Sequence, residues 1–150
     1  MKKKLLIASL LFVFLGACNN EDRKPPESEN DVDAARNFIR AALDGEFDKA
    51  KIYLLPDSQN IQYLDVAKRS YERAPQNTIK SYRESSITIY NVAPVNDSTT
   101  VVIYSNSFKN DHDTLKVLKI NDKWLVDLKY LYQHDMDSMG HQPVAKDTLR

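Results

Sequence analysis

The chain has 150 residues, with 21 basic and 21 acidic side chains, three histidines, three glycines and one cysteine. This length suits one domain, and the balanced charge excludes the basic face that nucleic-acid binding needs. The glycines lie too far apart for a phosphate-binding loop, and one cysteine excludes an internal disulfide or a multi-thiolate metal centre, so no cofactor is expected.

The N-terminus has the pattern of an export signal. Three lysines precede an apolar run over 5–15 that is too short to span a bilayer, which takes about 20 residues. Leu15-Gly16-Ala17-Cys18 resembles the lipobox of bacterial lipoproteins. The resemblance implies that residues 1–17 are a cleaved signal peptide and that Cys18 carries the lipid that anchors the protein to a membrane. An ordinary secreted protein is the alternative.

Residues 18–30 follow as an expected tether. They contain no large apolar side chain after Cys18 and include Pro25-Pro26, so we expect an extended, disordered segment. In Gram-negative lipoproteins, an Asp directly after the cysteine favours retention in the inner membrane. Asn19 departs from that rule and favours the outer membrane of the cell envelope, with the periplasmic or surface side left open.

Helical spacing of apolar residues begins after the tether. Residues three and four apart share one face, which predicts three helices. They run from a cap at Asp31 to the stop at Gly45, from Phe47 to Pro56, and from a cap at Asp57 or Ser58 to Pro75.

Beyond Pro75 the apolar residues alternate, which predicts strands. The expected strands cover 79–92 with a bend near 84–86, then 99–108, 114–120, and from Lys123 onward with Trp124, Val126, Leu128, Tyr130 and Tyr132 on one face. Asn121-Asp122 tolerates positive φ and predicts a two-residue hairpin. Residues 133–150 are polar and without a period, so we expect a flexible tail.

Helices followed by an antiparallel meander predict an α+β domain over residues 31–132. The arrangement resembles the NTF2-like (cystatin-like) superfamily, and more closely small lipoprotein families of unknown function that carry this domain (DUF4878-like). The resemblance is carried by the stripe Ala35–Phe38–Ile39–Ala42–Leu43, by 44–51 and by 117–127. It implies a cone of three N-terminal helices packed on a curved antiparallel sheet of about four strands. It implies no catalytic residue.

Four aromatic residues on the expected strands are candidates for lining a ligand pocket: Tyr82, Tyr90, Tyr104 and Trp124. Their rings would form walls and their polar tips would bind. The alternative assigns them to the core and the sheet surface. The apolar faces of the second and fourth strands would then suit pairing with a second copy, as a homodimer through the sheet.

Two groups contain residue types that bind zinc: Asp111-His112-Asp113, and His134, Asp135, Asp137 and His141. Turn chemistry accounts for the first group, and a loose tail does not hold ligands in place for the second. We therefore expect neither a metal site nor a histidine–carboxylate general base from these residues.

Together these patterns predict a cell-envelope lipoprotein with a non-enzymatic accessory or small-ligand-binding domain. One competing function is a small enzyme of dehydratase or isomerase type, in which a cone-lining Tyr is the acid and an Asp the base. The other is a protein-interaction module that uses the sheet face. Fold class does not separate the three, because function belongs to the site.

Overall fold

The structure is a computed structural model that describes residues 26–131. Its elements, in chain order, are α1 (Asp31–Asp44), α2 (Phe47–Ile52), α3 (Ser58–Glu72), α4 (Gln76–Glu84), β1 (Ile87–Asn96), β2 (Thr99–Asn106), β3 (Asp113–Ile120) and β4 (Lys123–Asp127). The expected signal peptide, Cys18, most of the tether, Tyr132 and the tail from 133 lie outside the described residues.

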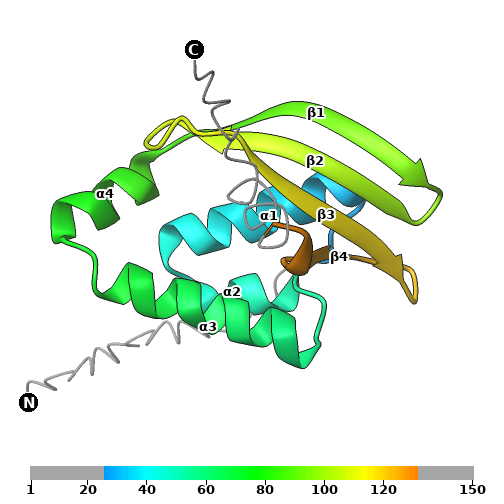
Figure 1. Ribbon diagram of the computed structural model, residues 1–150, viewed down its shortest axis with the longest axis horizontal. Helices are drawn as coiled ribbons and strands as arrows, with labels where there is room; N and C mark the ends of the chain where they lie inside the picture. The colour runs from blue at the N-terminus through cyan, green and yellow to red at the C-terminus, as the bar shows by residue number, and fades with distance from the viewer. Residues whose placement is uncertain (1–25, 132–150) are drawn as a thin grey trace, which may run out of the picture.

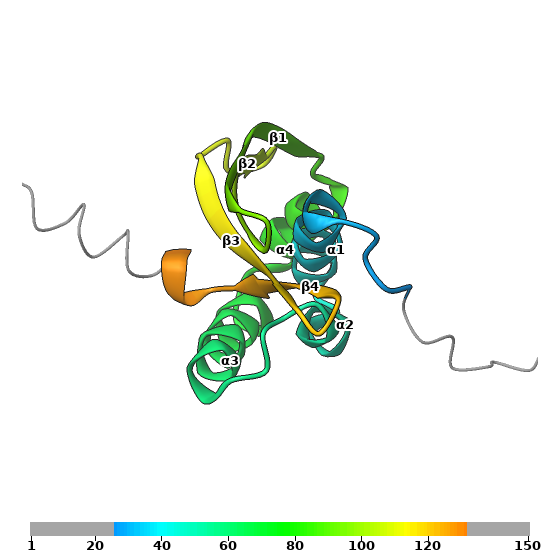
Figure 2. The ribbon, with the colours of Figure 1, turned by 90° about the vertical axis from the view of Figure 1, so that its right-hand side faces the viewer.

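The strands form one antiparallel sheet in the order β1-β2-β3-β4. The sheet curves around α1, while α2 and α3 lie on the same side, beyond α1 (Figures 1 and 2). Register shifts in β1, between Ile89 and Asn91 and between Pro94 and Asn96, bend this edge strand further. The predicted α+β class, with helices packed on a curved antiparallel sheet of four strands, is confirmed.

The core lies between α1 and the concave face of the sheet. Helical spacing places Ala34, Ala35, Phe38 and Ile39 on one face of α1. They pack in one buried cluster with alternating residues of the strands: Val102, Tyr104, Leu115, Val117 and Val126.

Short-range signals set the helix ends. Asn30, one residue before the expected cap, caps α1 by accepting a hydrogen bond from the Asp33 N–H at 2.9 Å. Asp57 caps α3 as predicted. Gly45 ends α1 with φ 78°, and a Cβ at this position would lie 2.6 Å from a ring carbon of Tyr71. Glycine is therefore required both by the backbone conformation and by the close approach of that ring.

The expected strand over 79–92 is wrong in its first half, because residues 76–84 form α4. A fourth helix therefore precedes the sheet, whereas three were expected. α3 ends at Glu72, before Pro75, and Pro75 is the N-cap of α4, a place where its missing N–H costs nothing. Ile79 is the only buried residue of α4, so the helical stripe in the sequence is too narrow to stand out from an alternating pattern.

The predicted Asn121-Asp122 hairpin is confirmed, with φ values of 49° and 61°. The expected continuation of the last strand to Tyr130 is wrong, since β4 ends at Asp127. The Leu128 N–H donates instead to the Asn60 side-chain oxygen at 2.7 Å. A tertiary hydrogen bond therefore ends this strand.

The residues just before α1 contact the domain. The Tyr53 hydroxyl donates to the Pro26 carbonyl at 3.3 Å, and Lys123 pairs with Glu27 at 2.7 Å. These contacts place residue 26 beside α2 and the β3–β4 hairpin.

Candidate ligand-binding site

A cavity of about 310 Å³ lies between α1, α3, α4 and β2. Its apolar wall comes mainly from α1 and from Phe47 at the start of α2. The polar residues that line it are all neutral: Ser70, Tyr71, Thr78, Tyr82, Tyr104 and Asn106. No charged residue is among the lining residues that the structure describes, so the cavity suits an apolar or neutral occupant.

Aromatic rings form one continuous side of the cavity. Tyr71 meets the edge of Phe47 at a centroid distance of 5.5 Å and stacks on Tyr82 at 6.0 Å. Tyr82 in turn meets the edge of Phe108 at 5.0 Å. Rings from α2, α3, α4 and the loop after β2 therefore support one another, which fixes the wall in place.

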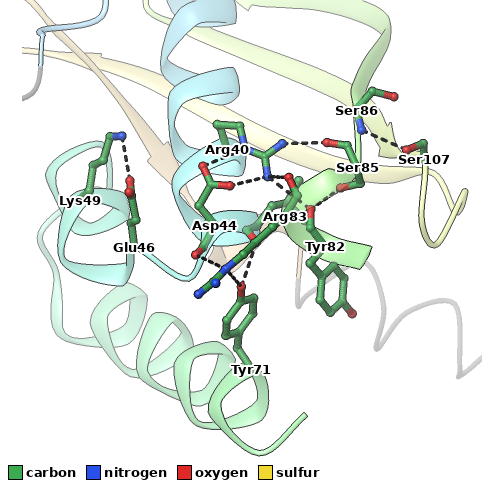
Figure 3. A network of polar contacts seen from close by, with 11 residues as sticks. Arg40, Asp44, Glu46, Lys49, Tyr71, Tyr82, Arg83, Ser85, Ser86 and Ser107 are labelled. Carbon is green, nitrogen blue, oxygen red and sulfur yellow. Dashed lines mark hydrogen bonds and ion pairs between the residues drawn. The ribbon is translucent and has the colours of Figure 1, made fainter. Parts of the chain in front are cut away.

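Arg40 of α1 holds the end of α4, one wall of the cavity, against α1 (Figure 3). Its guanidinium makes a bidentate pair with Asp44, at 3.0 and 2.7 Å, and donates to the Ser85 carbonyl at 2.7 Å. It also reaches the carbonyls of Tyr82 and Arg83. A cation at the carbonyl end of a helix is stabilising, so Arg40 holds the C-terminus of α4 against α1.

Tyr71 joins α3 to the same network (Figure 3). Its hydroxyl donates to the Leu43 carbonyl at 3.1 Å and accepts from Arg83 Nε at 3.3 Å. Arg83 Nε also contacts the Asp44 carbonyl at 3.2 Å. Three helices are thus joined at this end of the cavity.

Asn106, at the end of β2, is a cavity residue that sequence reasoning missed. The residue is only 5% exposed, and its Oδ1 accepts from the N–H groups of Phe108 at 3.2 Å and Lys109 at 3.0 Å. Within residues 26–131 its Nδ2 has no partner. An Asn at a strand end signals a turn, but nothing local in the sequence shows that its amide reaches a cavity.

The structure brings together two of the four aromatic candidates. Tyr82 and Tyr104 line the cavity. Tyr90 is 51% exposed, accepts a hydrogen bond from Ser105 and lies 4.2 Å from the His112 ring. Trp124 packs against the core with Lys119 5.9 Å from its ring, away from the cavity.

A second polar cluster lies at the other end of α3. The buried Asn60 donates to Asp57 at 2.9 Å and to Asp127 at 3.1 Å. Lys129 contacts Asp57 closely and lies 3.5 Å from Asp127. The hydrogen bond from the Asn60 backbone and the one from Lys129 lower the pKa of Asp57 to about 2, and the Asp57 hydrogen bond raises the pKa of Lys129.

Among the described residues, no group of three or more histidine, cysteine or acidic side chains is close enough to hold a metal ion. The second expected metal-type group, around His134, lies outside them. In the same part of the chain, no helix is long and apolar enough to cross a membrane.

Comparisons with known proteins identify the family of the chain. A family model described as a domain of unknown function (DUF4878) matches residues 27–127. A crystal structure of an NTF-2 like protein of unknown function from Shewanella oneidensis MR-1 is similar, with 18% identity, a TM-score of 0.47, and coverage of 63% of this chain and 89% of that chain. That likeness implies nothing about function. No curated protein matches the sequence. Because the family model spans more than half of the chain, the chain belongs to the DUF4878 family.

Proposed function

We propose that this protein is a membrane-anchored envelope lipoprotein whose domain binds a small apolar ligand without transforming it. The observation that carries the proposal is the neutral, aromatic cavity of about 310 Å³. Small-molecule sites are concave, largely apolar and fitted with a few polar groups. A cavity of about 150 Å³ holds benzene, so this one has room for roughly two rings.

The lining chemistry favours binding over the dehydratase or isomerase alternative. General acid–base catalysis needs a titratable group within reach of the reacting atom. Neither a carboxylate nor an imidazole is among the described residues that line the cavity. Asp113 lies opposite Tyr104 in the sheet register but is not a lining residue. A tyrosine hydroxyl alone supplies no base of suitable pKa near neutral pH.

Binding is tested with the neutral fluorescent two-ring dye 1-naphthylamine. We expect saturable binding that Ala67→Phe abolishes, because Ala67 lines the cavity and the added ring would fill it. Val66→Phe is the matched control, since Val66 is the neighbouring residue of α3 and is exposed. Equal dye binding by the two variants, or turnover of a small substrate by the purified protein, would contradict the proposal.

The anchor is proposed at Cys18, with the domain held close to the outer membrane. Eight Cα–Cα steps separate Cys18 from Pro26, which contacts the domain. Fully extended, they reach about 28 Å, so the face formed by α2 and the β3–β4 hairpin would lie near the lipid. Cys18→Ala should move the protein from the membrane fraction to the soluble fraction. Unchanged fractionation would refute lipid anchoring.

The convex face of the sheet supports a second candidate role, homodimer formation. Residues that alternate with the core residues on β2, β3 and β4 give this face partly exposed apolar side chains: Val101, Ile103, Leu118, Ile120 and Leu125. The helices α1–α3 lie on the opposite face (Figure 2). Sedimentation should show a dimer that Ile103→Glu converts to a monomer, and a monomeric wild type would exclude this role.

A further inference from the structure

We propose that the cavity selects a neutral ligand with an apolar body of about two rings and a hydrogen-bond acceptor oxygen, which pairs with the Asn106 side-chain amide. This inference rests on the proposed binding function and adds to it the chemical class of the ligand. It rests on the side chain of Asn106. The oxygen end of this side chain is hydrogen-bonded within residues 26–131, whereas the nitrogen end is not.

The orientation of the Asn106 amide is determined by its neighbours. Two backbone N–H groups, from Phe108 and Lys109, point at one end of the side chain. Only the carbonyl oxygen accepts hydrogen bonds, so Oδ1 must occupy that end and Nδ2 the other. If the amide were flipped, the N–H groups of Nδ2 would face the N–H groups of Phe108 and Lys109, and no acceptor would lie between them.

The lining of the cavity by Asn106 and the two hydrogen bonds at its Oδ1 point to Nδ2 as the end that faces the cavity. Asn106 lines it, and its Nδ2 has no partner within residues 26–131. In the same residues, every buried side-chain nitrogen or oxygen has a hydrogen-bond partner. Nδ2 must therefore be accessible from open space, although Asn106 as a whole is only 5% exposed. Two N–H donors are thus available to an occupant.

A donor in an apolar cavity discriminates between ligands. An occupant with an acceptor oxygen satisfies the amide, whereas a hydrocarbon of the same shape displaces water and leaves the amide unpaired. A ligand that only donates hydrogen bonds gains nothing from Nδ2, because that group cannot accept.

The surroundings also exclude an anionic ligand. No lining residue carries a positive charge that would compensate a carboxylate. Of the two cations in the network beside the cavity, Arg40 is already paired with both carboxylate oxygens of Asp44. The other, Arg83, donates its Nε to the Tyr71 hydroxyl and to the Asp44 carbonyl and is not a lining residue. The acceptor is therefore a neutral oxygen, such as that of a ketone, an ester or an amide.

Three naphthalene probes of nearly identical shape test this inference. 2-Acetylnaphthalene carries a ketone oxygen, 2-isopropenylnaphthalene replaces that oxygen by a methylene, and 2-naphthoate carries a negative charge. Their dissociation constants are measured by displacement of 1-naphthylamine. In the wild type we expect the ketone to bind about tenfold more tightly than the hydrocarbon, which is the effect of about one hydrogen bond, and the carboxylate to bind most weakly.

The decisive variant is Asn106→Asp. It keeps an oxygen for the Phe108 and Lys109 N–H groups and replaces the cavity-facing donor by an acceptor. The preference for the ketone over the hydrocarbon should disappear. Asn91→Asp, at an exposed position of β1, is the matched control and should retain the preference.

A measurement on the wild type covers the case in which Asn106→Asp does not fold. The side-chain amide resonances of Asn106 should shift with the ketone and stay unchanged with the hydrocarbon, in nitrogen–proton correlation spectra. Equal affinities for the two probes, or an unshifted Asn106 amide, would overturn the ligand class while leaving cavity binding intact. Failure of the dye itself to bind would instead overturn the proposed function.

Discussion

Two buried asparagines in this domain have different hydrogen-bond environments. Asn60, on α3, is fully buried and uses both ends of its side chain: Nδ2 donates to Asp57 and Asp127, and Oδ1 accepts from Leu128. Asn106, at the end of β2, uses Oδ1 twice, and its Nδ2 has no partner among residues 26–131.

The difference would separate the structural role of one side chain from the proposed binding role of the other. A buried amide whose hydrogen bonds are complete joins the elements around it, as Asn60 joins the start of α3 to the end of β4. A buried amide with one unused end costs stability unless something else satisfies it. Under the proposed binding function, a ligand in the cavity beside Asn106 would satisfy that end.

The largest effect is expected at Asn60. Asn60→Leu should lower the free energy of unfolding by about 3 kcal/mol, because it leaves the Leu128 N–H and the Asp127 carboxylate without their buried partner. Urea denaturation measures the loss. Gln62→Leu, two residues along α3 at an exposed position, should stay within about 0.5 kcal/mol of the wild type. A similar value for both variants would refute the structural role.

Asn106→Leu should cost less, about 1–2 kcal/mol, because the two N–H groups it abandons belong to exposed residues and can bind water. The same urea titration applies. Dye affinity should be retained in this variant, whereas Asn60→Leu should change stability without changing dye affinity per folded molecule. A loss of stability at Asn106 as large as that at Asn60 would remove the contrast between the two sites.

Acid should weaken the Asn60 cluster. The pKa of Asp57 is lowered from its ordinary 3.8 to about 2, so its contribution to stability is complete above pH 4 and is lost as the pH falls from about 4 to about 2. Thermal melts over this range should show a flatter decline for Asp57→Asn, which still caps α3. The control Asp65→Asn, exposed on the same helix, should follow the wild type.

The smallest changes in stability are expected for the hydroxyl groups of the two stacked tyrosines in the cavity wall, Tyr71 and Tyr82. Tyr71→Phe should lose about 1 kcal/mol, because its hydroxyl bonds to Leu43 and Arg83. Tyr82→Phe should change stability by less than about 0.5 kcal/mol, because its hydroxyl has no partner among the described residues and none is drawn in Figure 3. Thermal melts of the pair measure both, and equal losses would contradict the assignment of the wall contacts.

Local signals in the sequence predicted most of the scaffold. Three of these signals act within a few residues and can be recognised before the fold is known: the apolar stripe of α1, the Asp57 cap and the Asn121-Asp122 turn. Tyr82 and Tyr104 were recognised as cavity candidates because large aromatic residues with polar tips recur at binding sites.

The tertiary structure decided the rest, because the deciding partners are far apart in the chain. The end of β4 depends on Asn60, 68 residues from Leu128, and α4 is held by Arg40 through carbonyls more than 40 residues away. Asn106 becomes a cavity residue only when α1, α3 and α4 assemble opposite β2. By itself, the sequence determined the helical and strand periods, whose causes are local. The cavity, and the position of the unpaired Asn106 amide beside it, arise only when segments far apart in the chain pack together.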